Sequence, residues 1–162
     1  MRNGLVIADA GPIFSLAVIN QLELLDKLFN QIKIPRAVWN EITLHKNVSF
    51  YDSIVNYFSH RIHDISGFNE LTFVMDYGES EAVILYKELN ADFLLIDDKK
   101  ARTIAENFGM NCIGTLGLLN ISKEKRLIKD LRPFFIKLLE NNRYYSLELL
   151  NRILIARNEK PI

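Results

Sequence analysis

Cysteine and long apolar runs are scarce in this 162-residue sequence, and each scarcity excludes a class of protein. The single cysteine, Cys112, excludes an internal disulfide framework and fits a reducing compartment. No apolar run approaches the roughly 20 residues that span a bilayer. Asp9 interrupts the short apolar stretch near the N-terminus, which argues against a signal peptide. We therefore expect a cytoplasmic protein with no membrane segment.

The formal net charge of the chain is zero, but the charged residues are unevenly distributed along it. The 20 basic and 20 acidic side chains cancel, yet residues 1–98 hold 7 basic and 14 acidic ones. Residues 99–132 hold 8 basic and 3 acidic side chains. An acidic half followed by a basic segment suits a metal-dependent site that acts on a polyanion. A solvated surface with clustered charges explains the pattern equally well, so both interpretations stay open.

Short apolar runs alternate with helical patterns along the chain. The patterns predict strands at 4–9, 32–34, 93–96 and 111–113, a strand and loop within 60–75, and helices at 79–89 and 99–108. This alternation favours an α/β fold, a three-layer α/β/α sandwich with a central parallel sheet plus C-terminal helices. We assign residues 1–130 to the main domain and residues 131–162 to a helical extension packed on that domain.

Five acidic residues are expected near one edge of this sheet. Asp9 ends the first strand, and Asp97 and Asp98 follow a later one. Glu79 opens the central helix, and Glu41 lies in the helix after the second strand. Ligands of open α/β sheets bind at the carboxyl ends of the strands. Each residue alone also has a structural interpretation, as a helix cap or as a carboxylate that complements a helix dipole.

Taken together, the five carboxylates predict a cation site. Oxygen ligands of this kind suit Mg²⁺ or Mn²⁺. Carboxylates held close together without a cation raise one another's pKa values, and a divalent cation removes that penalty. The same cation activates water and neutralises charge on a phosphodiester.

The sequence resembles PIN domains, the compact α/β nuclease fold common in toxins of bacterial and archaeal toxin–antitoxin pairs. The resemblance covers roughly residues 4–130 and rests on four segments: IADAGPIFSLA, IPRAVWNEI, GESEAVILYKELNADFLLIDD and ARTIAENFGMNCIGTLGLL. The last helices resemble the tail of an uncharacterised PIN-like subfamily, so the main domain is expected to be PIN-like with a C-terminal extension.

The resemblance implies a set of catalytic carboxylates, namely Asp9, Glu41, Glu79 and Asp98. The implied metal ligands are the same four side chains and Asp97. Two positions depart from the family pattern. Glu79 stands where aspartate is more usual, and Ile96 stands where toxin-type members have Thr or Ser. Asp97 is a candidate for part of the polar role that Ile96 lacks.

Other charged residues lie near these acids in the sequence. Lys99, Lys100 and Arg102 are predicted to hold an RNA backbone through phosphate contacts, although a solvated helix face is the alternative. Glu81 and Asp76 are predicted to be solvated charges at a helix start.

The leading functional hypothesis is a Mg²⁺- or Mn²⁺-dependent endoribonuclease that hydrolyses phosphodiester bonds. The resemblance makes it the toxin of a toxin–antitoxin pair, with RNA as substrate, an antitoxin protein as partner, and a homodimer as its assembly. The alternative is a catalytically weak or inactive PIN-like module that binds nucleic acid or a protein. The apolar stripes after Pro133, which include Phe134, Phe135, Tyr144 and Tyr145, cover the core or form a dimer face.

Overall fold

The first strand, β1 (Asn3–Ala8), is the centre of the sheet in the computed structural model, which describes residues 3–162. It pairs in parallel with β2 (Phe29–Pro35) and β4 (Phe93–Leu95). The short strands β3 (Ile62–His63) and β5 (Cys112–Ile113) extend the edges, again in parallel, and give the order β3-β2-β1-β4-β5. A parallel sheet covered on both faces favours continuous apolar strands. The buried parts of β1 and β4 meet this expectation, whereas β2 contains the exposed polar residues Asn30 and Gln31.

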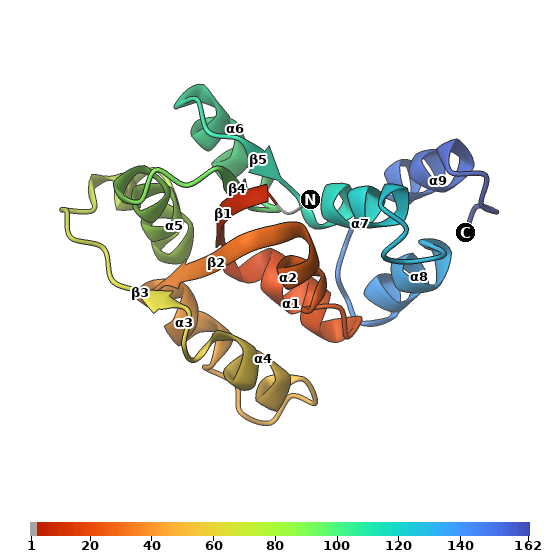
Figure 1. The fold of residues 1–162 in the computed structure, drawn as a ribbon, viewed down its shortest axis with the longest axis horizontal. Coiled ribbons are helices and arrows are strands. Elements are labelled where there is room, and N and C mark those ends of the chain that lie inside the picture. Colours follow the sequence, from red (N-terminus) through yellow and green to blue (C-terminus); the bar gives the residue numbers. More distant parts are fainter. Residues whose placement is uncertain (1–2) are drawn as a thin grey trace.

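Helices connect the strands and follow the last one (Figure 1). They are α1 (Ala10–Val18), α2 (Leu24–Leu28), α3 (Arg36–Ile42), α4 (Tyr51–Phe58), the 3₁₀ turn η1 (Glu70–Phe73), α5 (Tyr77–Glu88), α6 (Lys99–Asn107), α7 (Thr115–Glu124), α8 (Arg132–Glu140) and α9 (Leu147–Ala156). Among residues 3–162, no helix combines the length and the apolarity that crossing a bilayer demands.

Side chains alternate between two apolar cores, one on each face of the sheet. Val6 and Ala8 of β1 pack with α1, α2 and α3, whereas Ile7 packs with α5 and α6. This alternation is the period of a β-strand. Since both faces are covered by helices, the predicted α/β/α sandwich with a parallel sheet is confirmed.

Element boundaries differ from the prediction by a few residues. β2 begins at Phe29 rather than at Ile32, because the polar pair before Ile32 hides the start of the strand in the sequence. Pro35 ends β2 with extended backbone (ψ 164°) and is the N-cap residue of α3. The predicted strand and loop within 60–75 are present as β3 and the segment that follows, which also contains η1.

The predicted extension, residues 131–162, contributes to the same apolar core as α1. Phe135 and Leu138 of α8 and Leu150 and Leu154 of α9 have no exposed surface, and all belong to that core. Figure 1 shows α8 and α9 beside α7, on the side of the sheet where α1 lies. The position of a domain boundary near residue 130 stays a prediction.

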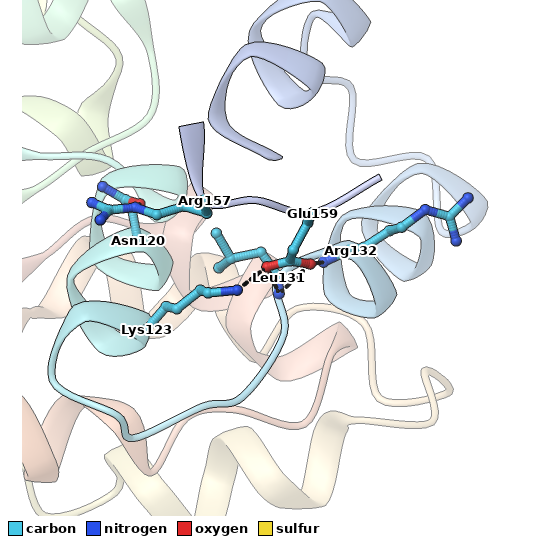
Figure 2. A network of polar contacts seen from close by, with 6 residues as sticks. All are labelled: Asn120, Lys123, Leu131, Arg132, Arg157 and Glu159. Atoms are coloured by element: carbon cyan, nitrogen blue, oxygen red, sulfur yellow. Dashed lines mark hydrogen bonds and ion pairs between the residues drawn. The ribbon is translucent and has the colours of Figure 1, made fainter. Parts of the chain in front are cut away.

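Glu159, just beyond α9, fastens the end of the chain to α7 and α8 (Figure 2). Its carboxylate accepts the backbone N–H groups of Leu131 (2.9 Å) and Arg132 (2.8 Å) and forms an ion pair with Lys123. Burial alone would raise the pKa of Glu159. The hydrogen bond from Leu131, Lys123 and the hydrogen bond from Arg132 outweigh that effect and hold its pKa below the usual value. Glu159 therefore caps α8 from a distant point in the chain.

Replacing this carboxylate is expected to destabilise the fold. Glu159→Ala removes a charged cap and one ion pair, which costs about 2 kcal/mol of unfolding free energy in urea titrations at pH 7. Glu148→Ala, which removes an 82% exposed partner of Arg152, is the matched control and should cost less than about 1 kcal/mol. Equal losses in the two variants would contradict the capping role.

The contribution of Glu159 to the free energy of unfolding should decrease at low pH. The pKa of Glu159 is lower in the folded than in the unfolded protein. The stabilisation by its carboxylate is therefore complete above the ordinary glutamate pKa of 4.5, and it is lost as the pH falls through the lower pKa of the folded state. The difference between wild type and Glu159→Ala should therefore shrink in unfolding curves recorded below pH 4.5.

Candidate active site

Asp9 is the buried carboxylate at the centre of the site. It leaves β1 as the N-cap residue of α1, and its backbone N–H donates to the carbonyl of Leu95 in β4 (2.9 Å). Only 6% of Asp9 is exposed. Burial raises its pKa to about 7; the backbone of Ala10 opposes that shift, and the negative charges of Glu79 and Glu41 add to it. The fold thus holds a carboxylate where its charge is disfavoured.

Glu41 approaches Asp9 through the space left by a glycine. A Cβ on Gly78, in the first turn of α5, would lie 2.9 Å from Oε2 of Glu41 and 3.8 Å from Oδ1 of Asp9. Any other residue at this position would press on the Glu41 carboxylate. Burial raises the pKa of Glu41, and the charge of Asp76 adds to the shift. The structure therefore brings these two predicted acids together.

Glu79 and Asp76 occupy the N-terminus of α5 as a capping box. The Glu79 carboxylate accepts the backbone N–H of Asp76 (3.3 Å). Burial raises the pKa of Glu79, that N–H lowers it, and the charges of Asp98, Asp76 and Glu41 raise it further. Asp76 is solvated as predicted, but its charge acts on the site. The D-x-x-E spacing of Asp76 and Glu79 in the sequence is typical of such a capping box.

Asp98 and Asp97, adjacent in sequence, serve different partners. Asp98 is exposed and caps α6, where it accepts the N–H of Ala101 (2.7 Å). It also lines an open cleft of about 350 Å³ together with Asp76 and Glu79. Asp98 therefore faces the same space as Asp76 and Glu79, whereas Asp9 and Glu41 do not line this cleft.

Asp97 faces away from that cleft into a hydrogen-bond network. Oδ1 accepts the N–H of Thr115 (2.7 Å), and Oδ2 accepts the hydroxyls of Thr115 (2.7 Å) and Tyr145 (2.8 Å). Ile96 beside it is fully buried in the core. Asp97 thus joins α7 and the C-terminal extension to the end of β4, and its role as a metal ligand stays a prediction.

The prediction that Glu81 is a solvated charge is wrong. Glu81 is 5% exposed, and its carboxylate accepts the backbone N–H of Ala37 (2.9 Å) in the first turn of α3. Pro35 before α3 has no side-chain acceptor, so Glu81 supplies the cap from α5. This contact holds together the helices that carry Glu41 and Glu79. No local pattern reveals a partner 44 residues away.

The three predicted RNA-contacting residues at α6 separate in space. Lys99 and Lys100 are exposed, and Lys100 lines the cleft beside Asp98. Arg102 instead pairs with Glu106 (2.8 Å) and donates to the carbonyl of Cys112 (3.3 Å) at β5. Of this set, Lys100 is therefore the side chain placed beside the acids.

The chemistry of these donors fits a hard divalent cation. Burial raises the pKa values of Asp9, Glu41 and Glu79, and repulsion from neighbouring carboxylates adds to each shift, from Asp76 in the case of Glu41. A cation bound among these carboxylates would relieve that repulsion. Within residues 3–162, no group of three or more acidic, histidine or cysteine side chains is already arranged to hold a metal ion. The acids form a cluster within electrostatic range rather than a closed coordination shell.

Sequence reasoning missed the residues that reach the site from the extension. Arg143 donates through Nε to Oγ of Ser15 (3.0 Å) and through Nη2 to the carbonyl of Gly11 (2.9 Å), both in α1. The Tyr145 hydroxyl lies 2.8 Å from that of Ser15. Burial and the charge of Asp97 raise the pKa of Tyr145 to about 12. A polar loop between two helices gave no sign of these contacts.

A parallel sheet with carboxylates gathered at the carboxyl ends of its strands defines an α/β protein with an acidic, cation-attracting site. A family model described as a PIN domain matches residues 5–159. The chain therefore belongs to the PIN-domain family, which confirms the resemblance found in the sequence, and this fold is generally that of metal-dependent nucleases.

One solved structure to which the chain is similar is a PilT N-terminus domain protein from the hyperthermophilic archaeon Sulfolobus solfataricus P2. The two share 21% sequence identity over 74% of this chain and 92% of that chain, with a TM-score of 0.47. No curated protein matches the chain significantly.

The burial of Asp9 predicts a stability gain when its charge is removed. Its pKa rises from 3.8 to about 7 on folding, so between these pH values the folded chain keeps a proton that the unfolded chain has lost. Stability of the metal-free protein therefore falls as the pH rises across this interval. Asp9→Asn should be more stable than wild type above pH 7, by on the order of 1–4 kcal/mol.

Thermal unfolding in EDTA at pH 8 measures this gain, and the advantage should disappear below pH 4. Asp130→Asn, at an exposed loop position, is the control and should leave stability nearly unchanged. Wild-type stability in an Asp9→Asn variant at pH 8 would contradict a raised pKa for Asp9.

Proposed function

We propose that this protein is a Mg²⁺- or Mn²⁺-dependent endoribonuclease that hydrolyses phosphodiester bonds. The observation that carries the proposal is the cluster of Asp9, Glu41 and Glu79. Burial raises the pKa of each, and the charges of neighbouring carboxylates, which include Asp76 and Asp98, add to these shifts. Membership of the PIN-domain family supports it, because this fold usually binds divalent metals. Four carboxylates, Asp9, Glu41, Glu79 and Asp98, are the proposed catalytic set.

Each acid has a distinct structural task in this proposal. Asp9 forms the buried side of the metal site, with the more exposed Glu41 next to it, and Glu79 and Asp98 form the side that borders the open cleft. A bound divalent cation supplies charge neutralisation at the phosphate and lowers the pKa of water. The chain's own part is to hold oxygen donors within reach and to keep α3 and α5 aligned through Glu81.

Lys100 is the proposed phosphate contact at the mouth of the cleft, with Lys99 beside it on the exposed start of α6. Such contacts hold the RNA backbone without selecting its sequence. Arg102 contributes to RNA binding in this proposal only through its charge, because its guanidinium is engaged by Glu106 and Cys112.

We further propose that the protein is a toxin of a toxin–antitoxin pair, acts in the cytoplasm as a homodimer, and is held inactive by an antitoxin protein. The resemblance of four segments to toxin-type PIN domains supports this assignment. Exposed apolar side chains on the extension, including Leu147 (50%) and Ile155 (62%), are available for a protein interface.

The second candidate function is a PIN-like module that binds nucleic acid or a protein with weak or no catalysis. Two observations favour it: Ile96 occupies the position of the usual hydroxyl and is buried, and Glu79 uses one oxygen in its capping box. Calorimetric titration with Mn²⁺ separates the candidates, because absence of binding at millimolar concentrations selects the non-catalytic module.

Removing either of two carboxylates is expected to abolish metal-dependent cleavage. Asp9→Asn and Asp98→Asn should each lower the rate of RNA cleavage in Mg²⁺ or Mn²⁺ by at least about 100-fold, because each removes a proposed cation ligand. The assay follows a labelled RNA on denaturing gels, and circular dichroism checks the fold of each variant. Asp130→Asn is the matched control. Wild-type cleavage by both variants would exclude this mechanism.

The toxin assignment has its own test in cells. Induced expression of the wild-type chain in a bacterial host is expected to arrest growth, and Asp9→Asn should remove the arrest at equal protein levels. Growth arrest that persists with Asp9→Asn would show that any toxicity does not come from this site.

A further inference from the structure

The loop between α8 and α9 brings a cationic side chain to the start of α1, next to the candidate active site. Arg143 in this loop donates to Gly11 and Ser15 of α1, as described above. A Cβ on Gly11 would lie 3.8 Å from Nη2 of Arg143 and 3.8 Å from Oδ2 of Asp9. The guanidinium and the central carboxylate thus flank the same bare position of the backbone.

Within residues 3–162, Arg143 forms no ion pair with a carboxylate, and Asp9 and Asp97 are the acids that lie with it around Gly11. The two acceptors that hold Arg143 are a hydroxyl and a carbonyl, both uncharged. Arginine has five N–H donors in a planar fork, and the two contacts to α1 use two of them. The remaining donors can serve an anion.

A chain of hydrogen bonds fixes the position of this loop. The Tyr145 hydroxyl has one proton, which it donates to Asp97, so Ser15 donates its own proton to Tyr145. Oγ of Ser15 is then the acceptor for Nε of Arg143. Ser15 is fully buried, and the chain ends on Asp97 at the end of β4. Arg143 is therefore held in place before any ligand arrives, which lowers the entropy lost on binding.

We propose that Arg143 binds a phosphate oxygen of the RNA at the candidate active site, which makes the C-terminal extension part of the substrate-binding surface. The inference rests on the proposed function for the identity of the substrate. Carboxylates attract a cation but repel a polyanion, so the site needs a fixed positive charge close to Asp9. A guanidinium suits this task because its planar fork matches two phosphate oxygens.

The test measures RNA affinity against salt concentration, because each phosphate contact adds to the salt dependence of binding. Binding is measured by fluorescence anisotropy with a short labelled RNA. EDTA in the buffer prevents metal-dependent cleavage of the RNA during the measurement. Arg143→Gln removes the charge but keeps an amide donor for Gly11. It should weaken binding about tenfold and make the slope of log K against log salt shallower by about 0.7, the value for one contact to a single strand.

Three controls separate charge from structure. Arg152→Gln changes the charge of the same extension at a 72% exposed position and should keep the wild-type slope. Tyr145→Phe breaks the hydrogen-bond chain but keeps the guanidinium. This variant should also keep the wild-type slope. Arg143→Lys keeps the charge without the fork, so it should retain the slope while binding more weakly. Equal loss of slope in the Lys and Gln variants would assign the effect to a displaced loop and overturn the proposal.

Cleavage assays distinguish this inference from the proposed function. If the wild type binds RNA with an Arg143-dependent slope but does not cleave it in Mn²⁺, the nuclease assignment fails and the phosphate contact stands. If Arg143→Gln has the wild-type slope, or if the wild type binds no RNA in EDTA, the phosphate contact is refuted whatever the cleavage result.

Discussion

The burial of one carboxylate beside two others is the constraint on which the rest of the site depends. Asp9 follows Val6, Ile7 and Ala8, the buried last residues of the central strand, so its position is determined by the sheet itself. Glu41 and Glu79 lie within electrostatic range of Asp9. Burial and the charges of neighbouring carboxylates, Asp76 among them, raise the pKa of all three. An arrangement that costs stability in the absence of a cation is retained here, which is the usual sign of a functional site.

Helix capping is what brings these acids together. Glu79 closes a capping box with Asp76 at α5, and Asp98 caps α6. Glu81 caps α3, the helix that carries Glu41. Contacts that satisfy the free N–H groups of three helices therefore also set the direction in which the acids point. Loss of a cap would move a functional side chain as well as weaken a helix.

The sequence is sufficient to predict features that depend on a local residue pattern, namely strands, helices and the acids near their ends. The central strand is a buried apolar run, α5 and α6 have helical periodicity, and the order of Asp9, Glu41, Glu79 and Asp98 follows from the ends of these elements. The contacts of Glu81 with Ala37 and of Arg143 with Ser15 are invisible to such reasoning, because the partners are 44 and 128 residues apart. A charge at a helix start looks the same in sequence whether it faces water or a neighbouring helix.

The extension is held at its last residues and at its middle loop, and the contact of that loop explains the position of Asp97. Glu159 fastens its last residues to the start of α8, and Tyr145 fastens the loop between α8 and α9 to Asp97. Asp97 accepts three hydrogen bonds from Thr115 and Tyr145 at the end of β4. Ile96 beside it is buried in the core and supplies no polar group. Asp97 holds the loop that carries Arg143, so the C-terminal part of the chain contacts α1 next to Asp9.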